Sequence, residues 1–132
     1  MAQIANVVVK KTDGTTDVTF TALNGGGGTA DRPACWVNTA SHGIKAYRNR
    51  FQMKAYLNGT KQARRVEVGG EFPIVRIVSG QDTMIGRIPV VLTVPVPEWA
   101  TDAEINEAID QSLNFFAAAH IRTHIKSGFT PT

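Results

Sequence analysis

Cysteine and long apolar runs are scarce in this 132-residue chain, and neither charge dominates it. The one cysteine, Cys35, excludes an internal disulfide and any metal site built from several cysteines of one chain. No apolar run approaches the roughly 18 residues that a membrane-spanning helix needs. Charged residues make up 19% of the chain and hydrophobic residues 42%, which excludes a disordered polyelectrolyte. The length predicts a single domain, 1–132, with one core.

Motifs for secretion, cofactor binding and catalysis are also missing. The N-terminus has no basic stretch of the kind that opens a signal peptide, so we expect the product to stay where it is made. The glycine run 24–28 lacks the Gly-Lys-Ser/Thr that a phosphate-binding loop requires, and we interpret it as a linker. His120 and His124 have the i, i+4 spacing of two metal ligands, but no local motif supplies a third, which favours structural roles. Cys35 is interpreted as a core residue, and we expect neither enzymatic activity nor a cofactor.

Charge is distributed by region, although the net charge is only +3. No acidic residue lies between Asp31 and Glu67, whereas that stretch holds eight basic residues: Arg32, Lys45, Arg48, Arg50, Lys54, Lys61, Arg64 and Arg65. The segment 98–110 is acidic instead, and basic residues follow it. Acids near the start of a helix and bases near its end both oppose the backbone dipole, so this second pattern is explained by helix stability.

Turn signals divide the first half of the chain into strands. Asp13-Gly14, between two valine-rich runs, predicts an N-terminal hairpin over about 6–21. A short buried strand is expected at 34–37. Asn58-Gly59 predicts a second hairpin in which Leu57 pairs with Thr60 and Tyr56 with Lys61.

Alternation of side chains along this second hairpin separates polar from apolar residues. One face carries Arg48, Arg50, Gln52, Lys54, Tyr56, Lys61, Ala63, Arg65 and Glu67. The opposite face carries Asn49, Phe51, Met53, Ala55, Leu57, Thr60, Gln62, Arg64, Val66 and Val68. We therefore predict one cationic face, opposed by Glu67 alone, and one apolar face that must be covered.

The second half of the chain predicts a sheet that ends near residue 97, followed by helices. Residues 71–86 mix proline and glycine with apolar residues, and we expect a long loop or an irregular edge strand there. A strand over 88–96 contains Pro89 and Pro95, so we expect it either to lie near a sheet edge or to end at Pro95. Thr101-Asp102-Ala103-Glu104 has the form of a capping box and begins a helical region over about 101–127, with a possible break at 117–120 and a stop at Gly128.

A flat cationic face has two interpretations. Solvated sheets often carry lysine and arginine only for solubility and edge protection. Against this, clustered positive charges repel one another unless an anion neutralises them. A sheet that combines Tyr56 and arginine planes with lysines suits unpaired RNA, because bases stack on the former and phosphates bind the latter. A cellular module that binds single-stranded nucleic acid is the alternative to the function given next.

Five stretches in order along the chain carry a family resemblance: Val7-Val8-Val9 to Asp17-Val18-Thr19, Trp36-Val37, Ala46-Tyr47-Arg48, Arg65-Val66-Glu67-Val68 and Leu92-Thr93-Val94-Pro95-Val96. The sequence resembles the coat proteins of single-stranded RNA bacteriophages, the levivirus-like family. The resemblance implies an α+β fold with an N-terminal β-hairpin, a five-stranded antiparallel sheet over about 34–97 and one or two C-terminal helices. It further implies an interlocked homodimer with one continuous sheet, in which the helices of each subunit cross onto its partner.

The resemblance also implies a function and a site. Family dimers assemble into a T=3 icosahedral shell in the bacterial host cytoplasm, with the segment corresponding to 69–87 at the symmetry axes, and the protein ends up in the virion. They bind a genomic RNA hairpin on the inward sheet face, which packages the genome and represses translation of the replicase. The positions carried over to this chain are Arg48, Arg50, Gln52, Lys54, Tyr56, Lys61, Ala63, Arg65, Glu67 and Arg87; the last stands where some relatives have a tyrosine. No membrane partner is expected.

Overall fold

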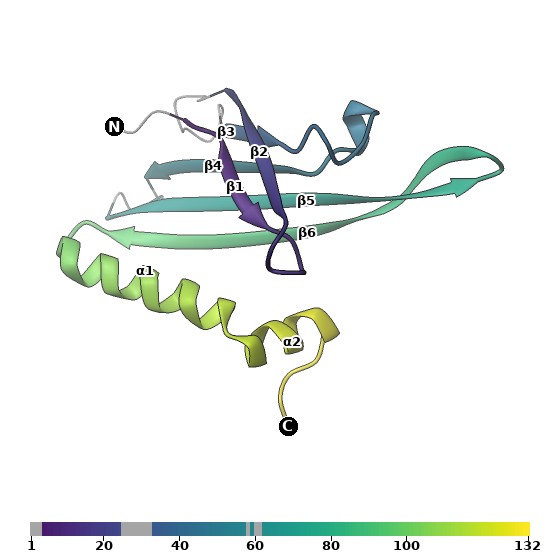
Figure 1. The fold of residues 1–132 in the computed structure, drawn as a ribbon. Coiled ribbons are helices and arrows are strands. Elements are labelled where there is room, and N and C mark those ends of the chain that lie inside the picture. Colours follow the sequence, from purple (N-terminus) through teal and green to yellow (C-terminus); the bar gives the residue numbers. More distant parts are fainter. Residues whose placement is uncertain (1–3, 25–32, 58, 60–61) are drawn as a thin grey trace. The chain divides into compact units, whose positions relative to one another are not determined.

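The computed structural model describes residues 4–24, 33–57, 59 and 62–132. It divides into two compact units, Met1–Pro95 and Val96–Thr132. We call them the sheet unit and the helical unit, and Figure 1 labels their elements. The expected linker at 24–28 lies outside the described residues except for Asn24. No helix in the described ranges is long and apolar enough to cross a membrane.

The sheet unit is one antiparallel sheet whose strands lie in the order of the sequence, β1-β2-β3-β4-β5-β6. The strands are β1 (Val7–Lys10), β2 (Asp17–Asn24), β3 (Ala34–Val37), β4 (Arg50–Leu57), β5 (Ala63–Val78) and β6 (Gln81–Pro97). A single 3-10 turn, Lys45–Tyr47, lies between β3 and β4. The expected α+β class is confirmed. Because β2 pairs with β3 as well as with β1, the N-terminal hairpin is part of the sheet, and the strand count is six.

The N-terminal hairpin is confirmed, with Lys10 opposite Asp17. Its turn contains Gly14 at φ +74°, a value that glycine tolerates best. The Asp13 carboxylate accepts hydrogen bonds from the backbone N–H groups of Thr15 and Thr16, both at 2.9 Å. The Thr16 hydroxyl, followed by these N–H groups, lowers the pKa of Asp13 from 3.8 to about 2. A charged side chain therefore fixes this turn.

The predicted pairing about Asn58-Gly59 is wrong by four residues. Leu57 pairs with Arg64, and Tyr56 pairs with Arg65. The observed register sets Met53 opposite Val68, whereas the predicted one would have set it opposite Arg64. It also creates two cross-strand pairs of opposite charge, Lys54 with Glu67 and Arg50 with Glu71. Such pairs stabilise a sheet. Since four is an even number, no side chain changes face.

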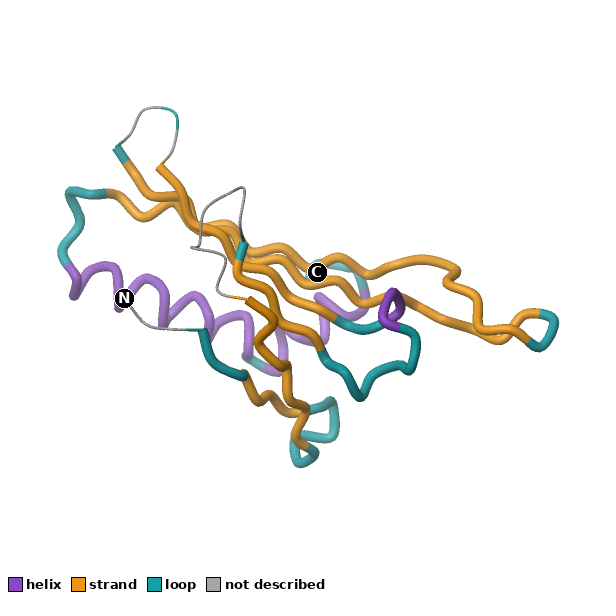
Figure 2. The backbone as a smooth tube through the Cα atoms, turned by 90° about the horizontal axis from the view of Figure 1, so that it is seen from above, coloured by secondary structure: helices purple, strands orange, loops and turns teal. Residues whose placement is uncertain are grey.

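The segment expected as a loop or irregular edge strand, 71–86, is instead the distal half of a regular hairpin. Strand β5 continues to Val78, and β6 begins at Gln81. The connecting residues Ser79 and Gly80 both have positive φ, at 53° and 79°, as a tight two-residue hairpin turn requires. The pairing of β4 with β5 ends at Arg50 with Glu71, so the β5–β6 hairpin extends past β4, as Figure 2 shows. The run 74–78 supplies the β-branched residues that hold it extended.

The helical unit contains α1 (Asp102–Ala117) and α2 (Ala119–Ser127). The capping box is confirmed, because the Thr101 side chain accepts from the Glu104 N–H and the Glu104 side chain accepts from the Thr101 N–H. The predicted break falls at Ala118, whose ψ of 137° is extended. Gly128 ends α2 at φ 78°, as expected.

Aromatic rings fill the centre of the sheet unit. The Phe51 ring meets Phe20 edge-to-face at 5.0 Å between centroids and Phe72 at 5.6 Å. A Cβ placed on Gly70, opposite Phe51, would lie 2.5 Å from its Cε1 atom, so this glycine lets the ring lie flat on the strand. Among the described residues, Phe20 and Ala63 are the only buried hydrophobic residues, at 4% and 8% exposed. The core of a single chain is therefore small.

Candidate nucleic-acid interface

The two faces of β4 and β5 are chemically different. Apolar side chains from the first five strands of the sheet line one cavity of about 260 Å³: Val7, Val9, Phe20, Trp36, Phe51, Met53 and Val68. Polar side chains, two glycines, a proline and a valine line a separate hollow of about 410 Å³: Arg50, Gln52, Lys54, Glu67, Gly69, Gly70, Glu71, Pro89 and Val91. Arg50, Gln52, Lys54 and Glu67 thus lie apart from Phe51, Met53 and Val68, as predicted for these residues. We call the surface around the second hollow the cationic face.

Glu67 organises the part of the cationic face nearer the Leu57 end of β4. Its Oε1 accepts a hydrogen bond from the Tyr56 hydroxyl at 2.9 Å and lies 3.1 Å from Arg65 Nε. Its Oε2 lies 3.2 Å from Lys54 Nζ. The Tyr56 hydroxyl, followed by Lys54, lowers the pKa of Glu67, so the carboxylate is ionised at neutral pH. Three of the predicted residues are thus held by a fourth.

Glu71 organises the other part. Its Oε2 lies 2.9 Å from both Nε and Nη2 of Arg50, and its Oε1 lies 2.8 Å from Arg87 Nη1. Arg87, followed by Arg50, lowers the pKa of Glu71. The expectation that Glu67 alone opposes the basic residues is therefore wrong. The signal was in the sequence, since the alternation of Glu67 and Gly69 continues to position 71.

The remaining predicted residues are more dispersed. Gln52 is exposed and lines the hollow opposite Gly69. Arg48 lies before β4, where its Nε donates to the His42 carbonyl at 2.8 Å and its Nη2 to the Gly43 carbonyl at 3.3 Å. Its guanidinium thus binds a loop. Ala63 is 8% exposed, and Lys61 lies outside the described residues.

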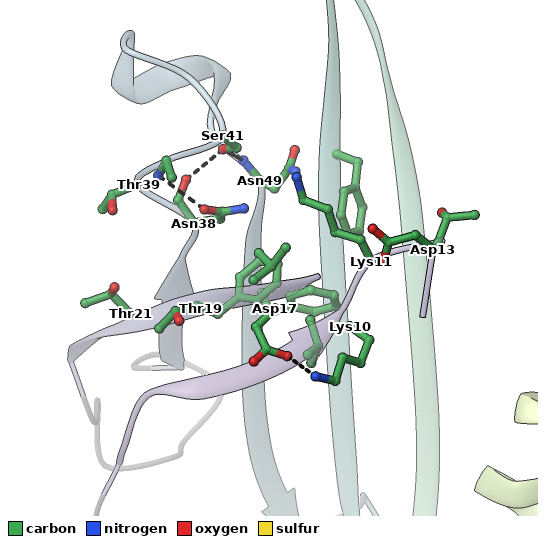
Figure 3. A pocket seen from close by; sticks show the side chains of 17 residues that line it. Lys10, Lys11, Asp13, Asp17, Thr19, Thr21, Asn38, Thr39, Ser41 and Asn49 are labelled. Carbon is green, nitrogen blue, oxygen red and sulfur yellow. Dashed lines mark hydrogen bonds and ion pairs between the residues drawn. The ribbon is translucent and has the colours of Figure 1, made fainter. Parts of the chain in front are cut away.

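A larger cavity, of about 910 Å³, lies beside the N-terminal hairpin (Figure 3). Its lining includes Phe20, Phe51 and Phe72, together with polar residues of the hairpin and of the loop after β3. Figure 3 shows the ion pair between Lys10 and Asp17 at the hairpin. It also shows the loop contacts, in which the Ser41 hydroxyl donates to the Asn38 carbonyl at 2.7 Å. The apolar part of this lining is continuous with the smaller apolar cavity through Val9, Phe20 and Phe51.

The two histidines of α2 that have the spacing of metal ligands contact each other. The rings of His120 and His124 meet edge-to-face at 4.8 Å, and His124 Nδ1 lies 3.2 Å from the Phe129 carbonyl oxygen. In the described part of the chain, no group of three histidine, cysteine or acidic side chains could hold a metal ion. Cys35 is partly buried, with Sγ 3.5 Å from the Pro33 carbonyl oxygen.

Comparison with known proteins supports one fold. No family model and no curated protein sequence matches the chain. Solved structures do. The virus-like particle of Beihai levi-like virus 21 gives a TM-score of 0.82 at 16% identity, covering 99% of this chain and 98% of that one. The virus-like particle of bacteriophage NT-214 gives 0.81 at 17% identity, covering 99% of each chain. The capsid protein of bacteriophage GA gives 0.73 at 16% identity, covering 96% and 95%. The chain therefore has the fold of the coat proteins that build levi-like and phage virus-like particles.

Proposed function

We propose that this chain is the coat protein of a single-stranded RNA phage, and that it forms a T=3-type icosahedral shell around its genome. The fold, shared over nearly the whole chain with capsid proteins, carries this proposal. The proteins that the chain resembles are structural, which favours a structural and non-enzymatic role. The virion is then its location, and the host cytoplasm its site of assembly.

Homodimerisation is the first step of the proposed assembly. Strand β6 is the last strand of the sheet, and its outer edge has no neighbouring strand in the described part of the chain. The helical unit exposes large side chains, with Leu113 at 47%, Phe115 at 58% and Phe116 at 45%. The apolar cavities of the sheet unit are the complementary surface. We infer that two sheets join along β6 and that the helices of each subunit cover the partner's apolar face, so that 1–132 acts as one domain only in the dimer.

Two measurements test this step. Sedimentation is expected to show a dimer or a closed shell, and electron microscopy to show uniform particles containing RNA. A folded, stable monomer would contradict the proposal. Discrete dimers that bind RNA but never close into particles would favour the cellular nucleic-acid-binding module instead.

RNA binding is proposed for the cationic face. Its two carboxylates each bind two cations, so each of these clusters keeps a net charge of +1. A surface with residual positive charge, a tyrosine and exposed guanidiniums fits single-stranded RNA. We propose that a genomic hairpin bound here also blocks translation of the replicase. A reporter gene placed behind the replicase start site of the same genome would lose repression when residues of the cationic face are replaced.

Salt dependence tests the face directly. Replacing Arg50 and Lys54 by alanine removes two net charges, so the slope of log affinity against log salt is expected to flatten by about 1.4, at about 0.7 per contact on single strands. The control is the double variant R122A/K126A, which removes the same charge from exposed positions of α2. An unchanged slope for R50A/K54A, or an equal loss in both variants, would contradict the assignment of the face.

A further inference from the structure

Glu71 joins three strands of the cationic face through one carboxylate. It extends from the middle strand, β5, while Arg50 comes from β4 and Arg87 from β6. One oxygen, Oε2, lies 2.9 Å from two nitrogens of Arg50, and the other, Oε1, lies 2.8 Å from Arg87. Each oxygen thus serves a different guanidinium. Charge-assisted hydrogen bonds of this kind fix the position of both partners.

The cluster is accessible to a ligand. The side chains of Arg50, Glu71 and Arg87 are 46%, 31% and 44% exposed. Arg50, Glu71 and Gly69 line the same hollow, and a Cβ placed on Gly69 would meet no atom within 4 Å. Open space therefore lies directly beside the ion pairs. A strand of RNA in that space would meet two guanidiniums whose combined charge is reduced to +1 by the carboxylate between them.

We propose that Glu71 is a positioning and charge-balancing residue of the RNA-binding face: it holds Arg50 and Arg87 in place and weakens the attraction of the face for arbitrary single-stranded RNA. The inference rests on the proposed RNA-binding function. Phosphate contacts supply affinity without sequence information, whereas contacts to bases supply discrimination. A carboxylate that cancels part of the phosphate attraction therefore leaves a larger share of binding to the arrangement of the bases. Glu71 thereby makes the face more selective.

The test compares the salt dependence of binding to a 20-nucleotide oligouridine. Glu71→Gln keeps the shape of the side chain and raises the cluster from +1 to +2. We expect the slope of log affinity against log salt to steepen by about 0.7, the value for one added phosphate contact on a single strand. The gain in affinity over the unaltered protein is then about fivefold larger at 0.1 M than at 1 M salt. The matched control is Glu107→Gln, which adds the same charge on α1, where Glu107 Oε2 accepts a hydrogen bond from Gln111 at 2.7 Å; its slope is expected to stay unchanged.

A double variant tests whether the slope follows the total charge of the cluster or the presence of Glu71 itself. In E71Q/R87A the cluster returns to +1, so its slope is expected to return to that of the unaltered protein. If E71Q does not fold, R87A alone serves, because it lowers the cluster to zero and is expected to flatten the slope by about 0.7. The inference is overturned if the slope of E71Q, or of R87A used in its place, equals that of the unaltered protein. It is also overturned if E71Q and E107Q steepen the slope equally.

The two proposals fail differently. If neither the unaltered protein nor E71Q binds oligouridine, or if both bind it independently of salt, the RNA-binding function itself is wrong. If R50A/K54A flattens the slope while E71Q leaves it unchanged, the face binds RNA and only the role of Glu71 is wrong.

Discussion

From the contact between Phe51 and Gly70 we predict how substitutions at Gly70 and Gly69 change the stability of the sheet unit. Adding a methyl group at Gly70 would place it 2.5 Å from Phe51 Cε1 and 3.0 Å from Cδ1 and Cζ, closer than ordinary contact allows. The ring has little room to move, since it also packs against Phe20 and Phe72. Overpacking of this kind costs about 1–3 kcal/mol. The neighbouring Gly69 is the control, because a methyl group there meets no atom within 4 Å.

The two alanine variants share every effect except the clash. Neither glycine has a positive φ, and both variants gain about 0.5–1 kcal/mol from reduced freedom of the unfolded chain. Their difference in the free energy of unfolding therefore isolates the overpacking cost, about 2 kcal/mol. With a urea dependence of about 2 kcal/mol per molar, the midpoint of G70A is expected about 1 M below that of G69A. Circular dichroism measures the two urea midpoints. The protein concentrations must be equal, because the stability of the proposed dimer depends on concentration.

A third variant identifies the atom responsible. Phe51→Leu removes the part of the ring that the methyl group would meet, so it is expected to reduce the penalty of G70A in a double-mutant cycle. A G70A midpoint equal to that of G69A would refute the packing described for the apolar face. An undiminished penalty in the Phe51→Leu background would refute the contact itself.

Two further predictions concern the helix start and the first turn. Thr101→Ala removes the hydroxyl that caps α1 and is expected to cost about 1 kcal/mol in urea unfolding, whereas Thr123→Ala, within α2, is expected to cost less. A larger effect at Thr123 would contradict the capping assignment. Because the pKa of Asp13 falls from 3.8 unfolded to about 2 folded, its charge stabilises the fold above about pH 4, and this stabilisation is lost as the pH falls towards 2. The difference in urea midpoint between the unaltered protein and D13N is therefore expected to shrink from pH 5 to pH 2, and a constant difference would contradict it.

The cationic face was predictable from the sequence because alternation depends only on whether a position is odd or even. Asn58-Gly59 is a strong local turn signal, but pairing also depends on which side chains meet across the strands. The contact of Met53 with Val68 and the charge pair of Lys54 with Glu67 set the register four residues away from the predicted one. A register error of three residues would have moved the cationic side chains to the apolar face. The actual register error, four residues, keeps every side chain on its predicted face.

The role of Glu71 was missed for a different reason. Pro73 and Gly80 indicate a loop, and a loop would interrupt the alternation that assigns Glu71 to the cationic face. In the structure β5 continues through Pro73 to Val78, and Arg50 has its partner at Glu71. The helix boundaries were predictable because Thr101, Glu104 and Gly128 are local signals that need no distant partner. The proposed association of two chains involves surfaces distant in sequence, so its prediction rests on the family resemblance.

The prolines of β6 have a consequence for how far the sheet can grow. Pro89, Pro95 and Pro97 occupy odd positions of the outermost strand, and proline has no N–H to donate. Alternate residues of a strand direct their N–H groups to opposite edges, and proline within a sheet is tolerated where that group would face away from the neighbouring strand. Prolines are tolerated on this strand because it is the last of the sheet, and each of them removes a donor from it. A strand interrupted in this way resists the endless lateral stacking that produces fibres.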